Sequence, residues 1–322
     1  MIKSDVIPIH CLFLPEISLE ETNFLIICYQ IMAQYSIKDV EMITGIKAHT
    51  LRIWEQRYNI PQPKRTATNI RYYDDEDLRM LLNISLLNLH GHKISEITRL
   101  SDQEVRELAI NYSIHSEKHE VHIQSLMATM INLDEVSFEK ILSTSILQYG
   151  LPRTVTEVIF PFMNLLGVMW MTGTVHPAYE HFITNLVRQK LIVAIDGQSS
   201  HKSNSQKKCL LFLPEGEHHE IGLLFANYVL RSAGHNTLYL GQSLPLSDLV
   251  QVKEKYNPDI IFTSMSTGFP STAAKNMVKQ LNSVFPKAVL LFTGRYFVEH
   301  LKEFDDSIHI IRTISDLSPF LL

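Results

Sequence analysis

The stretch CLLFLPEGEHHEIG, from Cys209 to Gly222, decides the fold of the C-terminal third of this chain. Five apolar residues ending at Leu213 are followed by a polar loop and then by a new apolar run. A short apolar run bounded by turn residues is typical of a strand buried on both faces. The loop places His218 and His219 among glutamates. Two interpretations are open here: a metal ligand with a supporting carboxylate, or a polar turn that contains histidine.

The segment after residue 207 alternates between strand-like and helix-like runs. This alternation predicts a doubly wound, parallel, five-stranded α/β domain over residues 207–322. The expected strands lie near residues 209–213, 237–240, 260–263, 289–292 and 308–311. The expected helices between them lie near residues 217–233, 246–256, 271–285 and 296–301. Ligands bind beyond the carboxyl ends of such strands, and His219 lies at that edge. No G-x-G-x-x-G motif follows the first strand, which argues against a dinucleotide.

The middle of the chain, residues 121–200, is predicted to form a four-helix bundle. Its helical periodicity is interrupted near residues 132–134, 150–152 and 172–177. Trp170 ends one expected helix, and Glu180 and His181 begin the next after nine intervening residues. The periodicity alone favours a core tryptophan and a surface Glu-His pair. The polar residues 105–120 before the bundle are interpreted as a linker.

The segment Lys47–Tyr73 is strongly basic. It has six Lys or Arg residues and one acid, Glu55, which gives +5 in a chain whose formal net charge is -5. Local positive charge of this kind is typical of a surface that contacts phosphates. A capping box at Ser36 and a break at Gly45 predict one short helix, and a second is expected over residues 47–58. Two short helices around a glycine turn indicate a helix-turn-helix.

Composition limits the remaining possibilities. The 322 residues are 45% hydrophobic and 20% charged, enough for several domains with cores of their own. Cys11, Cys28 and Cys209 have no paired spacing, which indicates a reducing, cytoplasmic environment. No run is long enough to span a bilayer, so no membrane partner is expected. Residues 1–33 are interpreted as an extension that is not native, with Met32 as the natural start.

Three segments of the basic module resemble the MerR family of transcription regulators. They are YSIKDVEMITGI (35–46), TLRIWEQRY (50–58) and RYY (71–73). The resemblance implies a winged helix-turn-helix over residues 34–104 that binds double-stranded operator DNA as a dimer and meets RNA polymerase only indirectly. Trp54 is expected in the core. The implied DNA contacts, which supply phosphate attraction and base readout, are Lys47, His49, Thr50, Arg52, Lys64, Arg65, Asn69, Arg71 and Tyr72.

A second resemblance concerns the loop from Pro214 to Gly222. The pattern Glu217-x-His219-x-x-Gly222 is similar to the Asp-x-His-x-x-Gly of the cobalamin-binding domain of methionine synthases and corrinoid mutases. It implies that His219 is the lower ligand of the cobalt of cobalamin. A neutral imidazole is a suitable cobalt ligand. Glu217, in place of the family's Asp, would hold the other ring N–H. His218 is the rival ligand, but its register to Gly222 is wrong.

The same family has a slot for the displaced nucleotide tail of the cofactor. The family lines it with a Ser-x-Leu and a Gly-Gly pair, which correspond here to Ser264-x-Ser266 and Thr293-Gly294. Gly222 completes the set. The chain departs from the pattern at Ser266, which replaces an apolar residue, and at Thr293, which replaces the first glycine. Both departures bear on the width of the expected slot.

The order of the three parts resembles the cobalamin-dependent, light-responsive MerR-type repressors of carotenoid genes over nearly the whole chain. The resemblance implies no enzymatic activity and a homodimer or homotetramer. It also implies that Trp170, Glu180 and His181 cover the upper face of adenosylcobalamin, with methylcobalamin as the alternative form. Met171 stands where light-responsive members have a histidine. Cobalamin binding is therefore better supported than a reversible response to light.

Two alternatives remain open from the sequence. In the first, the C-terminal half is only a dimerisation scaffold or binds another ligand, which Met171 and Thr293 leave open. In the second, the chain is a corrinoid methyl carrier, against which the basic helix-turn-helix argues. The operator sequence and the sign of regulation are not specified by these patterns.

Overall fold

The computed structural model describes residues 34–66, 68–116, 118–171, 175–198, 206–266, 271–300, 303–304 and 308–321. The chain divides into two compact units, Met1–Leu78 and Arg79–Leu322. The expected extension over residues 1–33 and the expected start at Met32 lie outside the described residues.

The first unit forms the predicted winged helix-turn-helix. Its elements are α2 (Ile37–Thr44), α3 (Ala48–Tyr58) and an antiparallel wing made of β1 (Lys64–Arg65) and β2 (Arg71–Tyr72). A capping box between Ser36 and Asp39 starts α2, and Gly45 ends it with a left-handed backbone at φ 73°. A β-bridge between Tyr35 and Tyr73, both fully buried, joins the end of the wing to the start of α2.

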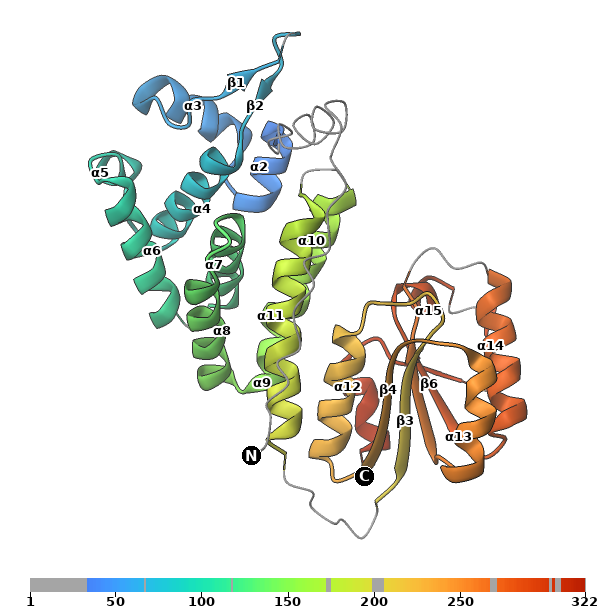
Figure 1. The fold of residues 1–322 in the computed structure, drawn as a ribbon. Helices are drawn as coiled ribbons and strands as arrows, with labels where there is room; N and C mark the ends of the chain where they lie inside the picture. The colour runs from blue at the N-terminus through green and yellow to red at the C-terminus, as the bar shows by residue number, and fades with distance from the viewer. Residues whose placement is uncertain are drawn as a thin grey trace, which may run out of the picture. The chain divides into compact units, whose positions relative to one another are not determined.

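A series of helices leads into the second unit and forms the predicted bundle (Figure 1). The leading helices are α4 (Asp75–Leu89), α5 (Ile94–Ile97) and α6 (Asp102–His115). The bundle consists of α7 (His119–Ile131), α8 (Glu135–Tyr149), the continuous run of α9 (Leu151–Thr154), the π-helical η1 (Val155–Ile159) and α10 (Phe160–Met171), and then α11 (Pro177–Asp196). The interruptions in the sequence pattern correspond to the ends of these helices.

Most of residues 105–120, which the sequence analysis interprets as a linker, is helical. Helix α6 continues to His115 and α7 begins at His119. Polarity is misleading here because the polar side chains bond within the helices. The hydroxyl of Ser113 is fully buried, donates to the carbonyl of Ala109 at 2.8 Å and contacts the hydroxyl of Ser125.

The C-terminal part of the second unit is the predicted parallel five-stranded sheet. Its strands are β3 (Lys208–Pro214), β4 (Asn236–Leu244), β5 (Ile260–Ser264), β6 (Val289–Thr293) and β7 (His309–Ile310), in the spatial order β4-β3-β5-β6-β7. All four pairings are parallel. The order reverses between β3 and β5, and ligands of doubly wound sheets bind beside such a reversal.

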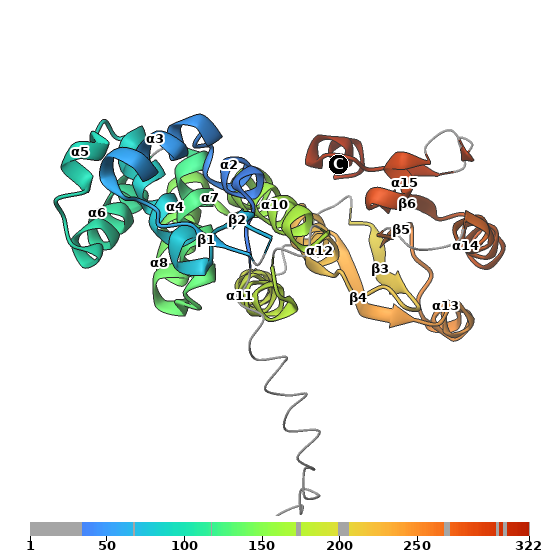
Figure 2. The same cartoon turned by 90° about the horizontal axis from the view of Figure 1, so that it is seen from above.

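Helices cover both faces of this sheet (Figure 2). They are α12 (Ile221–Ser232) and the 3-10 segment η4 (Ile314–Phe320) on one face, and η2 (Leu246–Asp248), α13 (Leu249–Lys255) and α14 (Ser271–Val284) on the other, with α15 (Arg295–Glu299) after β6. The core joins Phe212 and Phe292 of the sheet to Leu249 of α13 and Leu281 of α14. The bundle is joined to this domain through α11, which packs against α12.

Candidate functional site

The loop between β3 and α12 is built around the carboxylate of Glu217, which is 1% exposed. Its Oε1 accepts the backbone N–H groups of His218 at 2.9 Å and His219 at 3.0 Å, and the ring Nδ1–H of His219 at 2.6 Å. Its Oε2 accepts the backbone N–H of Ser266 at 2.6 Å, from the loop after β5. The expected helix start at Glu217 is therefore wrong. Residues 217–220 are held as a loop by this carboxylate, and α12 begins at Ile221.

The electrostatics of this loop fix the charge of Glu217. Burial raises the pKa of Glu217, but the hydrogen bonds from the ring and backbone of His219 and from Ser266 outweigh burial and lower the pKa to about 2. The same carboxylate raises the pKa of the His219 imidazole. Because Nδ1 of His219 bonds to Glu217, Nε2 lies on the opposite side of the ring. An exposed imidazole whose other nitrogen is held by a carboxylate has the geometry of a metal ligand.

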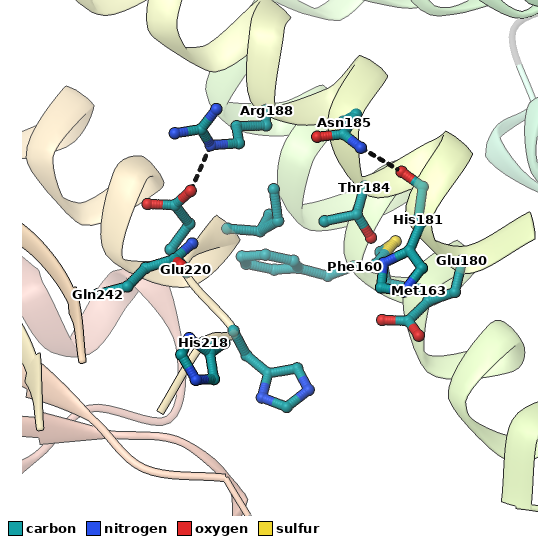
Figure 3. Close-up of a pocket in the computed structure, with 13 residues that line it drawn as sticks. Phe160, Met163, Glu180, His181, Thr184, Asn185, Arg188, His218, Glu220 and Gln242 are labelled. Atoms are coloured by element: carbon teal, nitrogen blue, oxygen red, sulfur yellow. Dashed lines mark hydrogen bonds and ion pairs between the residues drawn. The ribbon is translucent and has the colours of Figure 1, made fainter. Parts of the chain in front are cut away.

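A cavity of about 630 Å³ lies beside this loop (Figure 3). Residues 218–222 form one wall, and one face of α11 forms another. Figure 3 shows Glu180 and His181 of α11 on the side opposite His218. The residues that complete the wall are Phe160, Met163, Thr184, Asn185, Arg188 and Gln242.

Of the three residues predicted to cover the upper face of the cofactor, only two lie at this cavity. Glu180 and His181 line it, but Trp170 does not and is 55% exposed at the end of α10. Met171 is the last residue of that helix. The structure therefore brings together His219, Glu180 and His181.

An ion pair that sequence reasoning missed joins the two walls of the cavity. The Nε–H of Arg188, on α11, donates to Oε1 of Glu220, the residue directly after His219. The hydroxyl of Tyr239, on β4, donates to Oε2 of Glu220 at 2.9 Å. Burial and the Glu220 carboxylate raise the pKa of Tyr239, which therefore stays protonated. The signal for Arg188 was its helical spacing from Glu180 and His181, which places all three on one face of α11.

A second cavity of about 400 Å³ shares Phe160 and Gly222 with the first. Of the residues predicted for a tail slot, Gly222 and Thr293 line this cavity, whereas Ser264, Ser266 and Gly294 do not. The hydroxyl of Thr293 donates to the carbonyl of Ile311 at 2.7 Å. Its polar atom is therefore engaged at the end of β7.

Gly294 is required by a close approach of two backbone segments. Its φ is 98°, and a Cβ at this position would lie 2.2 Å from the carbonyl oxygen of Met265. Gly222 is different, because a Cβ there would meet nothing within 4 Å. Of the two glycines assigned to the tail slot, only Gly222 has open space beside it.

The predicted DNA-binding side chains lie on α3 and the wing of the first unit. Leu51 and Trp54 of α3 are buried, as expected for core residues, whereas His49 and Arg52 are exposed. Thr50 is partly exposed. In the wing, the guanidinium of Arg65 bonds to the side-chain oxygen of Asn69 at 2.8 Å.

Three of the predicted cations have acidic partners within this unit. The Nζ of Lys47 lies 3.0 Å from Glu41, and the Nζ of Lys64 pairs with Asp74. The Nε of Arg71 lies 3.4 Å from Glu55, the single acid of the basic segment. All three cations are 42% or more exposed, so a phosphate has access to each of them.

The comparisons with known proteins match this architecture. Residues 35–104 match the MerR HTH family regulatory proteins, and residues 123–194 match a B12 binding domain. The chain is 26% identical over 266 residues to the HTH-type transcriptional repressor CarH of Myxococcus xanthus, which covers 81% of this chain and 88% of CarH. It is 27% identical over 270 residues to the repressor CarA of the same organism, which covers 83% of this chain and 88% of CarA.

A solved structure supports the fold of the second unit. The monomethylamine corrinoid protein of Methanosarcina barkeri matches 66% of this chain and 98% of that chain, with a TM-score of 0.50 and 14% identity. None of the helices within the described residues is long and apolar enough to cross a membrane. The two family matches indicate a DNA-binding regulator with a cobalamin-binding domain. Residues 35–104 carry a helix-turn-helix of the MerR HTH family, and residues 123–194 behind it carry a B12 binding domain.

Proposed function

We propose that this protein is a transcriptional repressor whose binding to operator DNA is controlled by adenosylcobalamin. The observation that carries the proposal is the pair of Glu217 and His219. It lies at the carboxyl edge of a parallel sheet, faces a cavity of about 630 Å³, and has Glu180 and His181 across that cavity. His219 would be the lower cobalt ligand through Nε2, and Glu217 would fix its orientation.

The residues present fit a corrinoid in two respects. The donor set is a single exposed imidazole supported by a buried carboxylate, which suits a metal that brings its other ligands with it. The second cavity begins where the first ends, at Gly222, and is lined by apolar side chains such as Phe225, Phe262 and Leu317. We assign the nucleotide tail to this second cavity, with Thr293 on its wall.

The remaining residues have simpler roles in the proposal. Glu180 and His181 would cover the upper side of the cofactor, and the sequence resemblance adds Trp170 to this group. When bound, the cofactor would supply a cobalt–carbon bond that light can break. The chain's own contribution is to orient His219 and to exclude water from the upper side.

The relatives and the basic surface of the first unit support the proposed repressor function. CarH and CarA are named as transcriptional repressors and cover most of this chain. We infer a homodimer or homotetramer on a two-fold operator, with α3 in the major groove and the wing on the backbone. The candidate DNA contacts are Lys47, His49, Thr50, Arg52, Lys64, Arg65, Asn69, Arg71 and Tyr72.

The deciding experiment is an absorption spectrum of the purified protein after incubation with adenosylcobalamin in the dark and desalting. We expect a retained cofactor whose spectrum shows His ligation with the nucleotide tail displaced, and we expect its loss in His219→Ala. His218→Ala is the matched control and should retain the spectrum. Retention of the same spectrum in His219→Ala would reject this assignment.

The coupling to DNA needs a separate measurement. Operator affinity should differ among cofactor-free, dark-loaded and illuminated protein, with the dark-loaded form binding most tightly. Because Met171 stands where light-responsive members have a histidine, we expect recovery after illumination to differ from theirs. Equal affinity in all three states would reject control by the cofactor, even if cobalamin binds.

A further inference from the structure

The carboxyl end of β4 is irregular directly beside the cavity. Between Leu211 and Pro214, strand β3 advances three residues while β4 advances five, from Tyr239 to Leu244. The two register shifts lie on either side of Phe212. Bulges bend a strand and re-aim its side chains, and they are common next to binding sites.

The backbone of this segment adopts conformations that side chains disfavour. Gly241 has φ 79° and Ser243 has φ 51°, so two left-handed residues flank Gln242. A non-glycine residue in this region costs about 1–2 kcal/mol and persists only where its surroundings hold it. Because β4 is an edge strand, a bulge also discourages pairing with another chain. That role explains an irregular edge, but it does not explain where Gln242 lies.

The segment is fixed to the loop that holds His219. The backbone N–H of Ser243 donates to the carbonyl of Glu217 at 3.2 Å, and the N–H of Gly216 donates to the hydroxyl of Ser243 at 3.1 Å. Ser243 is thus bonded on both sides to the turn that positions the cobalt ligand. Gln242 therefore has a set position relative to His219.

Gln242 lies on the cavity wall, and its side chain has no hydrogen bond to any described residue. Figure 3 shows it beside Glu220, on the same side of the cavity as His218. The nearby Glu220 is already occupied by Arg188 and Tyr239. Gln242 is therefore a neutral donor and acceptor at the rim of the cavity.

We propose that Gln242 binds a carboxamide side chain at the edge of the corrin ring and so helps to orient the ring over His219. This inference rests on the proposed cobalamin function. A primary amide is complementary to another primary amide, because each has an N–H donor and a carbonyl acceptor. The corrin ring carries primary carboxamides around its edge, and a ring held by His219 would bring that edge toward Gln242 on the same cavity wall.

The test changes both partners of the proposed contact, Gln242 in the protein and one carboxamide in the ligand, and measures binding affinity. The ligands are cobalamin and its monocarboxylates, in each of which one side-chain carboxamide is hydrolysed to an acid. Gln242→Ala should weaken cobalamin binding about 3- to 10-fold, as expected for loss of neutral hydrogen bonds. Gln242→Glu should weaken one monocarboxylate by at least about tenfold more than it weakens cobalamin, because two carboxylates then face each other.

The matched control is Gln251→Ala, an exposed glutamine on α13 that does not line the cavity. It should change no affinity. Unchanged cobalamin binding in Gln242→Ala, or an equal effect of Gln242→Glu on all monocarboxylates, would overturn the inference. Either result leaves the cobalamin function intact if the wild type still shows the spectrum that depends on His219. A wild type that binds no cobalamin would instead reject both.

Discussion

The helix-turn-helix unit and the cavity beside His219 both contain ion pairs between a half-exposed cation and a carboxylate, but the carboxylates are buried to different degrees. In the first unit the side chains of Asp74 and Glu55, which pair with Lys64 and Arg71, are 11% and 10% exposed. Beside the cavity the side chains of Glu217 and Glu220 are 1% and 5% exposed, and each accepts more than one hydrogen bond. A half-exposed cation is screened by salt and can exchange its carboxylate for a phosphate. Buried carboxylates are fixed, because removal of their donors leaves an uncompensated charge.

The strongest test of this difference is Arg188→Ala. The buried Glu220 would then keep only the hydroxyl of Tyr239 as a side-chain partner among the described residues. We expect the free energy of unfolding to fall by about 3 kcal/mol, the lower end for a broken buried pair because Arg188 is half exposed. Urea unfolding measures this loss.

Lys190→Ala on the same helix is the control for Arg188. Its carboxylate partner Glu139, 2.9 Å away, is 40% exposed, against 5% for Glu220, so this pair should contribute about 0–1 kcal/mol. Equal decreases in the free energy of unfolding in the two variants would mean that burial of the carboxylate does not determine the contribution of these ion pairs. Arg188→Lys should recover part of the loss.

The second test replaces the buried carboxylate by an amide in Glu217→Gln. One acceptor oxygen becomes a donor that faces the N–H groups of His219 or Ser266. We expect cobalamin affinity to fall about 10- to 100-fold, as for the loss of a partner that orients a metal ligand. An absorption titration measures it, and the exposed Glu215→Gln is the control. Undiminished affinity would show that Glu217 does not orient the ligand.

The third test concerns a buried group that has no ionic partner. His122 is fully buried in the bundle, with Nε2 3.0 Å from the carbonyl of Ser116 and Nδ1 2.9 Å from the hydroxyl of Ser145. Burial lowers the pKa of His122, and the neighbouring His119 lowers it further. A lowered pKa means that the unfolded chain binds the proton more tightly. As far as His122 is concerned, the free energy of unfolding is therefore highest above about pH 6.5. It falls as the pH drops below that value.

Denaturant unfolding between pH 5 and 7 measures this effect. The contribution of His122 to the slope does not exceed that of one proton, about 1.4 kcal/mol per pH unit. His122→Gln should remove that contribution, and the exposed His181→Gln should not. An unchanged slope in His122→Gln would show that other groups dominate the pH dependence.

The smallest effect on stability is expected in the first unit, for Lys64→Ala. Stability should fall by about 1 kcal/mol, less than in Arg188→Ala, because Asp74 is more exposed than Glu220 and keeps the backbone N–H of Asp77 as a donor. If Lys64 contacts a phosphate, the slope of log affinity for operator DNA against log salt should become less negative by about one. Lys253→Ala on α13 should leave the slope unchanged, and an unchanged slope in Lys64→Ala would remove that residue from the DNA surface.

Local signals made most of the fold predictable. The capping box at Ser36, the stop at Gly45 and the alternation of apolar runs depend on residues close in sequence, and the helix-turn-helix and parallel sheet follow from them. The loop of Glu217 and His219 was predictable for the same reason, since a spacing of two residues defines the pair. The polar helix ends near Ser113 were not, because their hydrogen bonds form only after the helices pack.

Contacts between distant segments were beyond sequence reasoning. Arg188 and Glu220 are separated by 32 positions, and nothing in either local pattern names the other. The bond of Thr293 to Ile311 likewise depends on how β6 and β7 align. Trp170 was grouped with Glu180 and His181 by resemblance, and its exposure at the helix end could not be deduced from spacing.

At Gly222, greater helix stability conflicts with space for a ligand. It lies in the first turn of α12, where alanine would strengthen the helix by less than the roughly 1 kcal/mol of a helix interior and where the surroundings have room for the methyl group. That room is the junction of the two cavities. A programme that selected variants only for heat resistance would accept Gly222→Ala early. The selected protein would be more stable, but the junction between its two cavities would be narrower. The weaker ligand binding would be detected only in a binding measurement.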